Sequence, residues 1–221
     1  MSQHIVNSYD QELSALISAI INMGGLVKEL LEIAGKSLHE LDKNFIEIAN
    51  ITDQKINKYD SEIEYRATVL LALRQPMAID LRQVVSALKL AVIMERMGDL
   101  AKNVAKRATR MDMEISSDIL DNIDQMIAII VTMLEDVMIA FKMHDDNKAL
   151  DVAERDRNVD KIYYDLMNKL INDNLKLSSN TSSMMQLIFV VKNVERIGDY
   201  VTKIAKITHY IITGERLKKA L

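Results

Sequence analysis

The chain has 221 residues, with 28 basic against 32 acidic side chains and a net charge of −4. Nucleic-acid-binding domains usually carry an excess of basic residues, so this balance argues against DNA or RNA as a partner. The absence of cysteine excludes disulfides, thiolate nucleophiles, iron–sulfur clusters and zinc sites with cysteine ligands. Only six glycines and one proline are present, too few for the turns of a sandwich or barrel. With 49% hydrophobic residues, the composition is typical of a soluble, nearly all-helical protein.

Neither a targeting segment nor a membrane span is evident. The first residues lack the basic region followed by an apolar region that marks a secretory signal peptide. The longest apolar stretch, at 126–141, is interrupted by Glu135 and Asp136 and is shorter than the about 20 residues of a membrane span. We therefore expect a cytoplasmic protein that meets membranes only through its partners.

The chain contains two related halves. The segments VIMERMGDLAKNVAKRATR (92–110) and VVKNVERIGDYVTKIAKITHY (190–210) share the pattern ER-[MI]-GD at an offset of 100 residues. Small and apolar residues recur in both segments at alternating spacings of four and three, the pattern of a helix packed along a bundle. A duplicated helical unit explains both observations.

Periodic segments around the repeated helices predict three helices in each half. The predicted helices cover residues 8–42, 43–74, 77–110, 117–142, 145–175 and 181–212. The expected fold is therefore all-α, a tandem repeat of two three-helix bundles over residues 1–112 and 113–221, with a hinge at 111–116.

Three breaker residues refine this prediction. Pro76 suits the first turn of the third helix, where a missing N–H costs nothing. Gly24 and Gly25 lie inside the first helix and predict either a kink or a close approach by another helix. The clearest predicted loop is at 177–181.

Oxygen-bearing side chains form a stripe on the third predicted helix. Glu95, Asp99 and Asn103 stand four residues apart, which places them along one face. Like charges at this spacing repel by a few tenths of a kcal/mol, and a hard cation bound by carboxylate and amide oxygens would reverse that repulsion. Gly98 lies beside the stripe, where it allows a neighbouring helix to come close.

The second half repeats the stripe as Glu195 and Asp199. Lys203 replaces the amide of the first stripe, and because an ammonium has no lone pair this copy has one ligand fewer. The alternative for both stripes is a solvated helix edge with Arg96 and Arg196 as local salt-bridge partners.

The middle helices offer further ligands. Asp53 and Asn57 lie in the segment DQKIN, and Asp156 and Asp160 lie in the similar segment DRNVD. Their offset is 103 rather than 100 residues. Asp60 aligns with Asp160 in the other register, and the sequence does not choose between the two.

Other catalytic signatures are absent from the sequence. The four histidines are scattered and none follows a glutamate by three residues, which excludes the Glu-x-x-His ligands of ferritin-like di-iron proteins. The sequence has no P-loop, dinucleotide-binding or nucleophile-elbow motif. The alternatives to a regulatory binding protein are a purely structural helical interaction module and a metal-dependent hydrolase or oxidase on a helical bundle, which would need an open coordination position.

The run LLALRQPMAIDLRQVVSALKLAVIMERMGDLAKNVAKRA (70–108) resembles the signature of the PhoU family, phosphate-uptake regulators of bacteria and archaea. The shared motifs are RQPxxxDLR at 74–82, ERxGD in each half, and TGE at 213–215. The resemblance spans almost the whole chain. It implies two tandem three-helix bundles without enzymatic activity, and hence no catalytic residues.

The resemblance also implies a function. Family members are negative regulators of phosphate uptake and of the phosphate-starvation response, and they communicate between a phosphate ABC transporter ATPase and a sensor histidine kinase. We therefore expect the same two partners, together with a homodimer.

Some family members bind multinuclear metal clusters through E/DxxxD stripes. The chain departs from the family pattern at Lys203, and at Leu100 and Tyr200, where many members have histidine. The metal could be Fe, Mg, Mn or Zn, since oxygen-rich sites accept several ions. Carried over residue by residue, the resemblance nominates as metal ligands Glu95, Asp99, Asn103, Asp53, Asn57, Glu195, Asp199, Asp156 and Asp160.

Overall fold

The computed structural model describes residues 2–174 and 181–217, which form six α-helices and no strand. The all-α class and the helix number are confirmed, and the ends differ from prediction by at most two residues, except that the first helix begins at Ser2. The predicted loop at 177–181 lies almost wholly outside the described residues. The helices are α1 (Ser2–Glu40), α2 (Asn44–Arg74), α3 (Ala78–Ala108), α4 (Ser117–Met143), α5 (Asp146–Asn174) and α6 (Thr181–Thr213).

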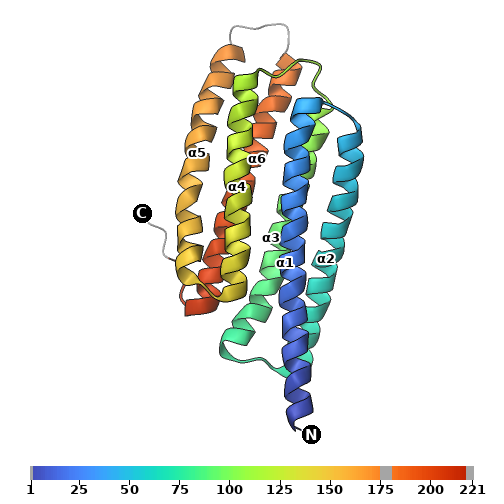
Figure 1. Ribbon diagram of the computed structural model, residues 1–221, viewed down its shortest axis with the longest axis vertical. Helices are drawn as coiled ribbons and strands as arrows, with labels where there is room; N and C mark the ends of the chain where they lie inside the picture. The colour runs from blue at the N-terminus through green and yellow to red at the C-terminus, as the bar shows by residue number, and fades with distance from the viewer. Residues whose placement is uncertain (1, 175–180, 218–221) are drawn as a thin grey trace.

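The helices of each half pack on one another, and the halves meet along two helix pairs (Figure 1). Helix α1 packs against α4 and α3 against α6, whereas α2 and α5 lie on opposite outer sides. Helices α3 and α6 are antiparallel, because Arg82 near the start of α3 contacts Ile211 near the end of α6, while Arg107 contacts Gln186 at the other end. The buried apolar residues form one continuous core through both halves.

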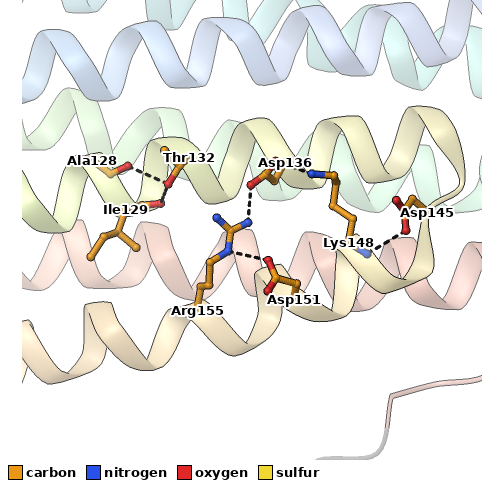
Figure 2. Close-up of polar contacts among 8 residues, drawn as sticks. All are labelled: Ala128, Ile129, Thr132, Asp136, Asp145, Lys148, Asp151 and Arg155. Carbon is orange, nitrogen blue, oxygen red and sulfur yellow. Dashed lines mark hydrogen bonds and ion pairs between the residues drawn. The ribbon is translucent and has the colours of Figure 1, made fainter.

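The turn between α4 and α5 is fixed by a small polar network (Figure 2). Asp145 accepts a hydrogen bond from the backbone N–H of Lys148 at 3.0 Å, as an N-cap residue does. Asp136 on α4 accepts from the Lys148 ammonium at 2.9 Å and from the Arg155 guanidinium at 2.6 Å. Hydrogen bonds from these two α5 cations lower the pKa of Asp136 and hold α5 beside α4.

The start of α3 is held by residues of the RQPxxxDLR segment. Pro76 precedes the N-cap residue Met77, so it lies in the connection and not, as predicted, in the first helical turn. The hydroxyl of Tyr9 donates to Asp80 at 2.8 Å. Arg82 donates to the carbonyl of Ile211 at 2.8 Å, which satisfies a backbone acceptor at the end of α6. This segment therefore fastens the first half to the end of the second.

Helix α1 continues through Gly24 and Gly25 without a break. A β-carbon on Gly24 would lie only 2.8 Å from the sulfur of Met138 on α4, whereas one on Gly25 would meet nothing within 4 Å. Of the two options that the sequence left open, the close helix approach is therefore present, at Gly24.

Among the described residues, α1 is the one helix that is long and apolar enough to cross a membrane by length and composition, with a mean hydropathy of 1.4 in its most apolar part. The sequence prediction considered uninterrupted apolar runs and did not find it. In the structure α1 packs against α2, α3 and α4, and its buried residues belong to the common core. Within the bundle, 39% of this most apolar part of α1 is buried.

Two glycine substitutions test the close approach of α2 to α3. A β-carbon on Gly98 would lie 3.0 Å from the fully buried Ile56, so Gly98→Ala forces a packed core to shift, at a cost of about 1–3 kcal/mol. Gly25→Ala meets open space and should raise the free energy of unfolding by about 1 kcal/mol through helix propensity. Urea denaturation should place Gly98→Ala clearly below Gly25→Ala. Equal stabilities would show that α2 does not approach α3 this closely.

Candidate functional site

The two repeated glycines set the register of the outer helices. A β-carbon on Gly98 would contact Ile56 at 3.0 Å and Asp53 at 3.8 Å. One on Gly198 would contact Asp156 at 3.0 Å and Val159 at 3.5 Å. Both pairs of contacts correspond to an offset of 103 residues.

This register settles the ambiguity of the sequence. Asp53 corresponds to Asp156, and Asn57 corresponds to Asp160. Asp60 has no acidic counterpart in this register, although it is close enough to Glu95 to affect its pKa. The structure thus brings acids of α2 towards those of α3, and acids of α5 towards those of α6.

In the first half, a lysine joins the acids of the two helices. The ammonium of Lys102 donates to Asp53 at 2.6 Å and to Asp99 at 2.8 Å. Burial acts to lower the pKa of Lys102, but its hydrogen bonds to Asp53 and Asp99 outweigh this effect and raise it. Asp53 is only 5% exposed, so the lysine neutralises a carboxylate that water barely reaches. Lys102 was not among the predicted site residues.

The other predicted residues of the first half lie around this ion pair. Burial raises the pKa of Glu95, and the neighbouring Asp99 adds to the rise. Arg96 approaches Glu95 at 3.6 Å, as the alternative interpretation of a salt-bridged helix edge expects. Asn57 is exposed and Asn103 is half-buried. We call the acids Asp53, Glu95 and Asp99 with Lys102 the first cluster.

The second half places four acids together without an equivalent lysine, since residue 202 is threonine. Burial raises the pKa of Asp156 to about 6, with further contributions from Asp160 and Asp199. Burial also raises the pKa of Glu195, and nearby Asp199, Asp160 and Asp156 add to it. We call Asp156, Asp160, Glu195 and Asp199 the second cluster.

The nearest bases compensate the second cluster only in part. Lys206 lowers the pKa of Asp156 and Lys192 lowers that of Glu195, yet both carboxyls remain raised overall. The ammonium of Lys203, which reduces the ligand count of this stripe, lies over the ring of Tyr200 at 4.2 Å. The second stripe has one ligand fewer than the first, because Lys203 stands in the place of Asn103, but the second cluster has Asp160 in the place of Asn57 and lacks the bridging lysine.

Buried carboxylate oxygens in both clusters lack partners. Oε2 of Glu195 in the second cluster and Oδ1 of Asp53 in the first are inaccessible and have no hydrogen-bond partner. Thr202 is only 8% exposed and lies beside Asp156, where its hydroxyl offsets part of the rise in pKa. Leaving such atoms unpaired costs about 1–3 kcal/mol each, which a bound cation or water would recover.

The donor set of the second cluster fits a hard cation. Its carboxylate and hydroxyl oxygens suit Mg²⁺, Mn²⁺ or oxidised iron better than softer ions. In the part of the chain that the structure describes, no three acidic or histidine side chains converge closely enough to hold an ion as they stand. Binding therefore requires the exposed carboxylates of Asp160 and Asp199 to rotate inwards. The first cluster fits a metal less well, because an ammonium already lies between Asp53 and Asp99.

The pKa of Asp156 predicts a pH-dependent effect on stability in metal-free protein. The folded value of about 6 exceeds the ordinary 3.8, so the folded state holds the proton more tightly and loses stability as the pH rises from about 4 to 6. Asp156→Asn should raise the free energy of unfolding by about 1 kcal/mol at pH 7.5, a value that allows for solvent screening of a part-buried group. The gain should vanish near pH 4.

Urea denaturation with EDTA at both pH values measures this difference. Asp53→Asn is the matched control, and it should lower stability at pH 7.5 because it removes the partner of Lys102. A loss of stability in Asp156→Asn at pH 7.5 would contradict the assigned environment.

Comparison with known sequences identifies relatives that cover both halves of the chain. The sequence model of the PhoU domain matches this chain twice, over residues 20–108 and 123–208, once in each half. A phosphate-specific transport system accessory protein PhoU homolog of Caulobacter vibrioides is 36% identical over 218 residues, which are 98% of this chain and 95% of the relative. The homolog of the same name from Zymomonas mobilis is 34% identical over 214 residues, 97% of this chain and 90% of the relative.

Solved structures share the fold. The crystal structure of the phosphate transport system regulatory protein PhoU from Streptococcus pneumoniae has a TM-score of 0.87 at 30% identity, over 95% of this chain and 99% of that one. PhoU from Pseudomonas aeruginosa has a TM-score of 0.88 at 29% identity, over 94% of this chain and 100% of that one. The repeated sequence motif, the helix arrangement and these matches agree, and the chain belongs to the PhoU family.

Proposed function

We propose that this protein is a negative regulator of phosphate uptake and of the phosphate-starvation response. The observation that carries the proposal is the full-length likeness to relatives named as accessory proteins of the phosphate-specific transport system. A solved relative is likewise named a regulatory protein of phosphate transport. These names describe proteins that act on a transport system, and we infer that this chain acts by binding and not by catalysis.

The proposed partners are the ATPase of a phosphate ABC transporter and a sensor histidine kinase. Long helices with a continuous core make a stiff scaffold, which suits an adaptor that must present fixed surfaces to two proteins. On this proposal the protein is cytoplasmic, a homodimer, and reaches the membrane only through these partners.

Deletion of the gene in its native host tests the regulatory role. Alkaline phosphatase activity in phosphate-replete medium should be high in the deletion strain and low in the wild type, because the starvation response is no longer restrained. Complementation with the wild-type gene should restore low activity. Unchanged activity in a strain without a second copy of the gene would contradict the proposal.

We further propose that the second cluster binds a hard metal ion and that the first cluster holds the Lys102 ammonium in its place. The support lies in the unpaired Oε2 of Glu195 and in the raised pKa of Asp156, in a cluster without a bridging lysine, whereas in the first cluster Lys102 joins Asp53 to Asp99. A metal there would supply charge neutralisation between α5 and α6. The protein's own contribution is to hold four acids at one helix interface.

Manganese binding distinguishes the two clusters. Asp199→Asn should weaken Mn²⁺ binding by about tenfold or more in equilibrium dialysis, because affinity for hard cations follows the number of charged ligands. Asp199 is exposed, so the substitution should leave the fold intact. The matched variant Asp99→Asn, at the repeat-related position of α3, should bind Mn²⁺ almost as tightly as wild type.

A second variant tests the same assignment through a gain of Mn²⁺ binding instead of a loss. Lys102→Thr gives the first cluster the threonine found at position 202 and frees Asp53 and Asp99. It should add Mn²⁺ binding beyond the wild-type stoichiometry. Equal losses in Asp199→Asn and Asp99→Asn, with no gain in Lys102→Thr, would refute the assignment.

Two alternative functions predict different results in these experiments. A purely structural helical module predicts neither metal binding nor a phosphate phenotype. A metal-dependent enzyme predicts turnover of phosphate esters that depends on added Mn²⁺ and is lost in Asp199→Asn. The names of the relatives favour the regulator over both.

A further inference from the structure

A small cavity lies between the start of α3, the end of α6 and the segment that follows α6. Its volume is about 260 Å³. The lining residues are Ser86, Lys89, Lys206, Ile207, Tyr210, Arg216 and Leu217.

The charge in this cavity is all of one sign. Lys89 comes from α3, Lys206 from α6 and Arg216 from the segment after α6, and no acidic residue lines the cavity. None of these three cations has an ion pair or hydrogen bond within the described residues, although ion pairs are common elsewhere on the helices. Lys206 is close enough to Asp156 to lower its pKa, but no acid lines the cavity itself, so the three neighbouring positive charges repel one another. An anion in the cavity would remove that repulsion.

The segment that carries Arg216 is fixed against α3. Gly214 has a φ of +79°, a left-handed conformation that turns the chain after α6. A β-carbon on Gly214 would lie 3.5 Å from the guanidinium of Arg82, which also donates to the carbonyl of Ile211. The turn therefore brings Arg216 into the lining of the cavity, to which Lys89 also belongs.

The repeat supplies an internal comparison. At the other end of the α3–α6 pair, the residues related to Ser86 and Lys89 are Gln186 and Phe189. There Arg107 donates to Gln186 at 2.8 Å and lies over the ring of Phe189 at 4.4 Å. Arg107 therefore has side-chain partners at that end, although its buried Nε has none, whereas Lys89, Lys206 and Arg216 make no such contact within the described residues.

The chemistry of the lining selects a phosphate group. An arginine fork, two ammonium groups and the hydroxyls of Ser86 and Tyr210 all donate hydrogen bonds, as a doubly charged tetrahedral oxyanion requires. Pockets for drug-sized ligands span about 300–1,000 Å³, so this cavity suits a smaller anion than a nucleotide. We propose that it binds the phosphate group of inorganic phosphate or of a small phosphate monoester.

Anion binding in the cavity depends neither on the proposed metal site nor on the proposed regulatory role, and the experiment tests it separately from both. Backbone amide NMR shifts of uniformly labelled full-length protein are followed during titration with inorganic phosphate, and separately with glycerol phosphate. EDTA is present so that no metal bridges the anion to the acid clusters. Ionic strength is held constant with sodium chloride so that general screening does not change. Saturable shifts are expected around Lys89, Tyr210 and Arg216.

Single substitutions localise the binding. Lys89→Gln and Arg216→Gln should each raise the dissociation constant by about tenfold or more, since each removes a charged hydrogen-bond donor. Both residues are exposed, so the fold should persist. Lys106→Gln is the matched control, because Lys106 is the exposed repeat mate of Lys206 and does not line the cavity. It should leave binding unchanged.

The two titrations identify the source of the phosphate group. Saturation by the inorganic ion alone assigns the cavity to free phosphate, and saturation by the ester alone assigns it to a monoester. The absence of saturable shifts with both ligands would overturn the proposal. So would a loss of affinity in Lys106→Gln as large as that in Lys89→Gln.

Discussion

Two positions without a side chain, Gly98 on α3 and Gly198 on α6, govern how closely the outer helices pack. A β-carbon at either position would come within 3.0 Å of an atom of α2 or α5. The close approach buries Ile56 and Val159 at the contact, and it also carries Asp53 and Asp156 against the inner helices. Close packing of the core thereby places carboxylates at an interface where they have lost much of their hydration. Their negative charge must then be compensated by the surroundings.

The two halves meet this requirement in different ways. In the first half a lysine one turn from Asp99 reaches across to Asp53 and offsets part of the negative charge of the cluster. In the second half the corresponding side chain is Thr202. The negative charge of the acids must there be compensated by protonation, by more distant lysines or by a bound cation. Burial without a bridging cation raises the pKa of Asp156. Duplication preserved the backbone of the unit, and the side chains then diverged at the position that decides its charge.

The sequence predicted the helices well, because apolar periodicity and an exact repeat are local signals. It did not settle the register of α2 on α3, since offsets of 100 and 103 both aligned acids and only contacts with Gly98 and Gly198 distinguish them. The difference between Lys102 and Thr202 is visible in the repeat. Spacing alone does not say whether a long lysine side chain reaches an acid or solvent. The cavity joins α3 to a segment more than a hundred residues away, and no local pattern marks it.

Lys206 connects the second cluster to the cation-rich cavity between α3 and α6. It lines the cation-rich cavity, and its charge also lowers the pKa of Asp156 in the second cluster. An anion in the cavity would offset that charge, so the acids of the cluster would hold a cation or a proton more tightly. Coupling between two sites is reciprocal, so a cation in the cluster would in turn strengthen anion binding. The first half has no such link, because Lys106 lies outside the cavity and Lys102 is already committed to two carboxylates. On the two proposals above, the metal site and the anion site therefore share α6, and their coupling would pass through Lys206.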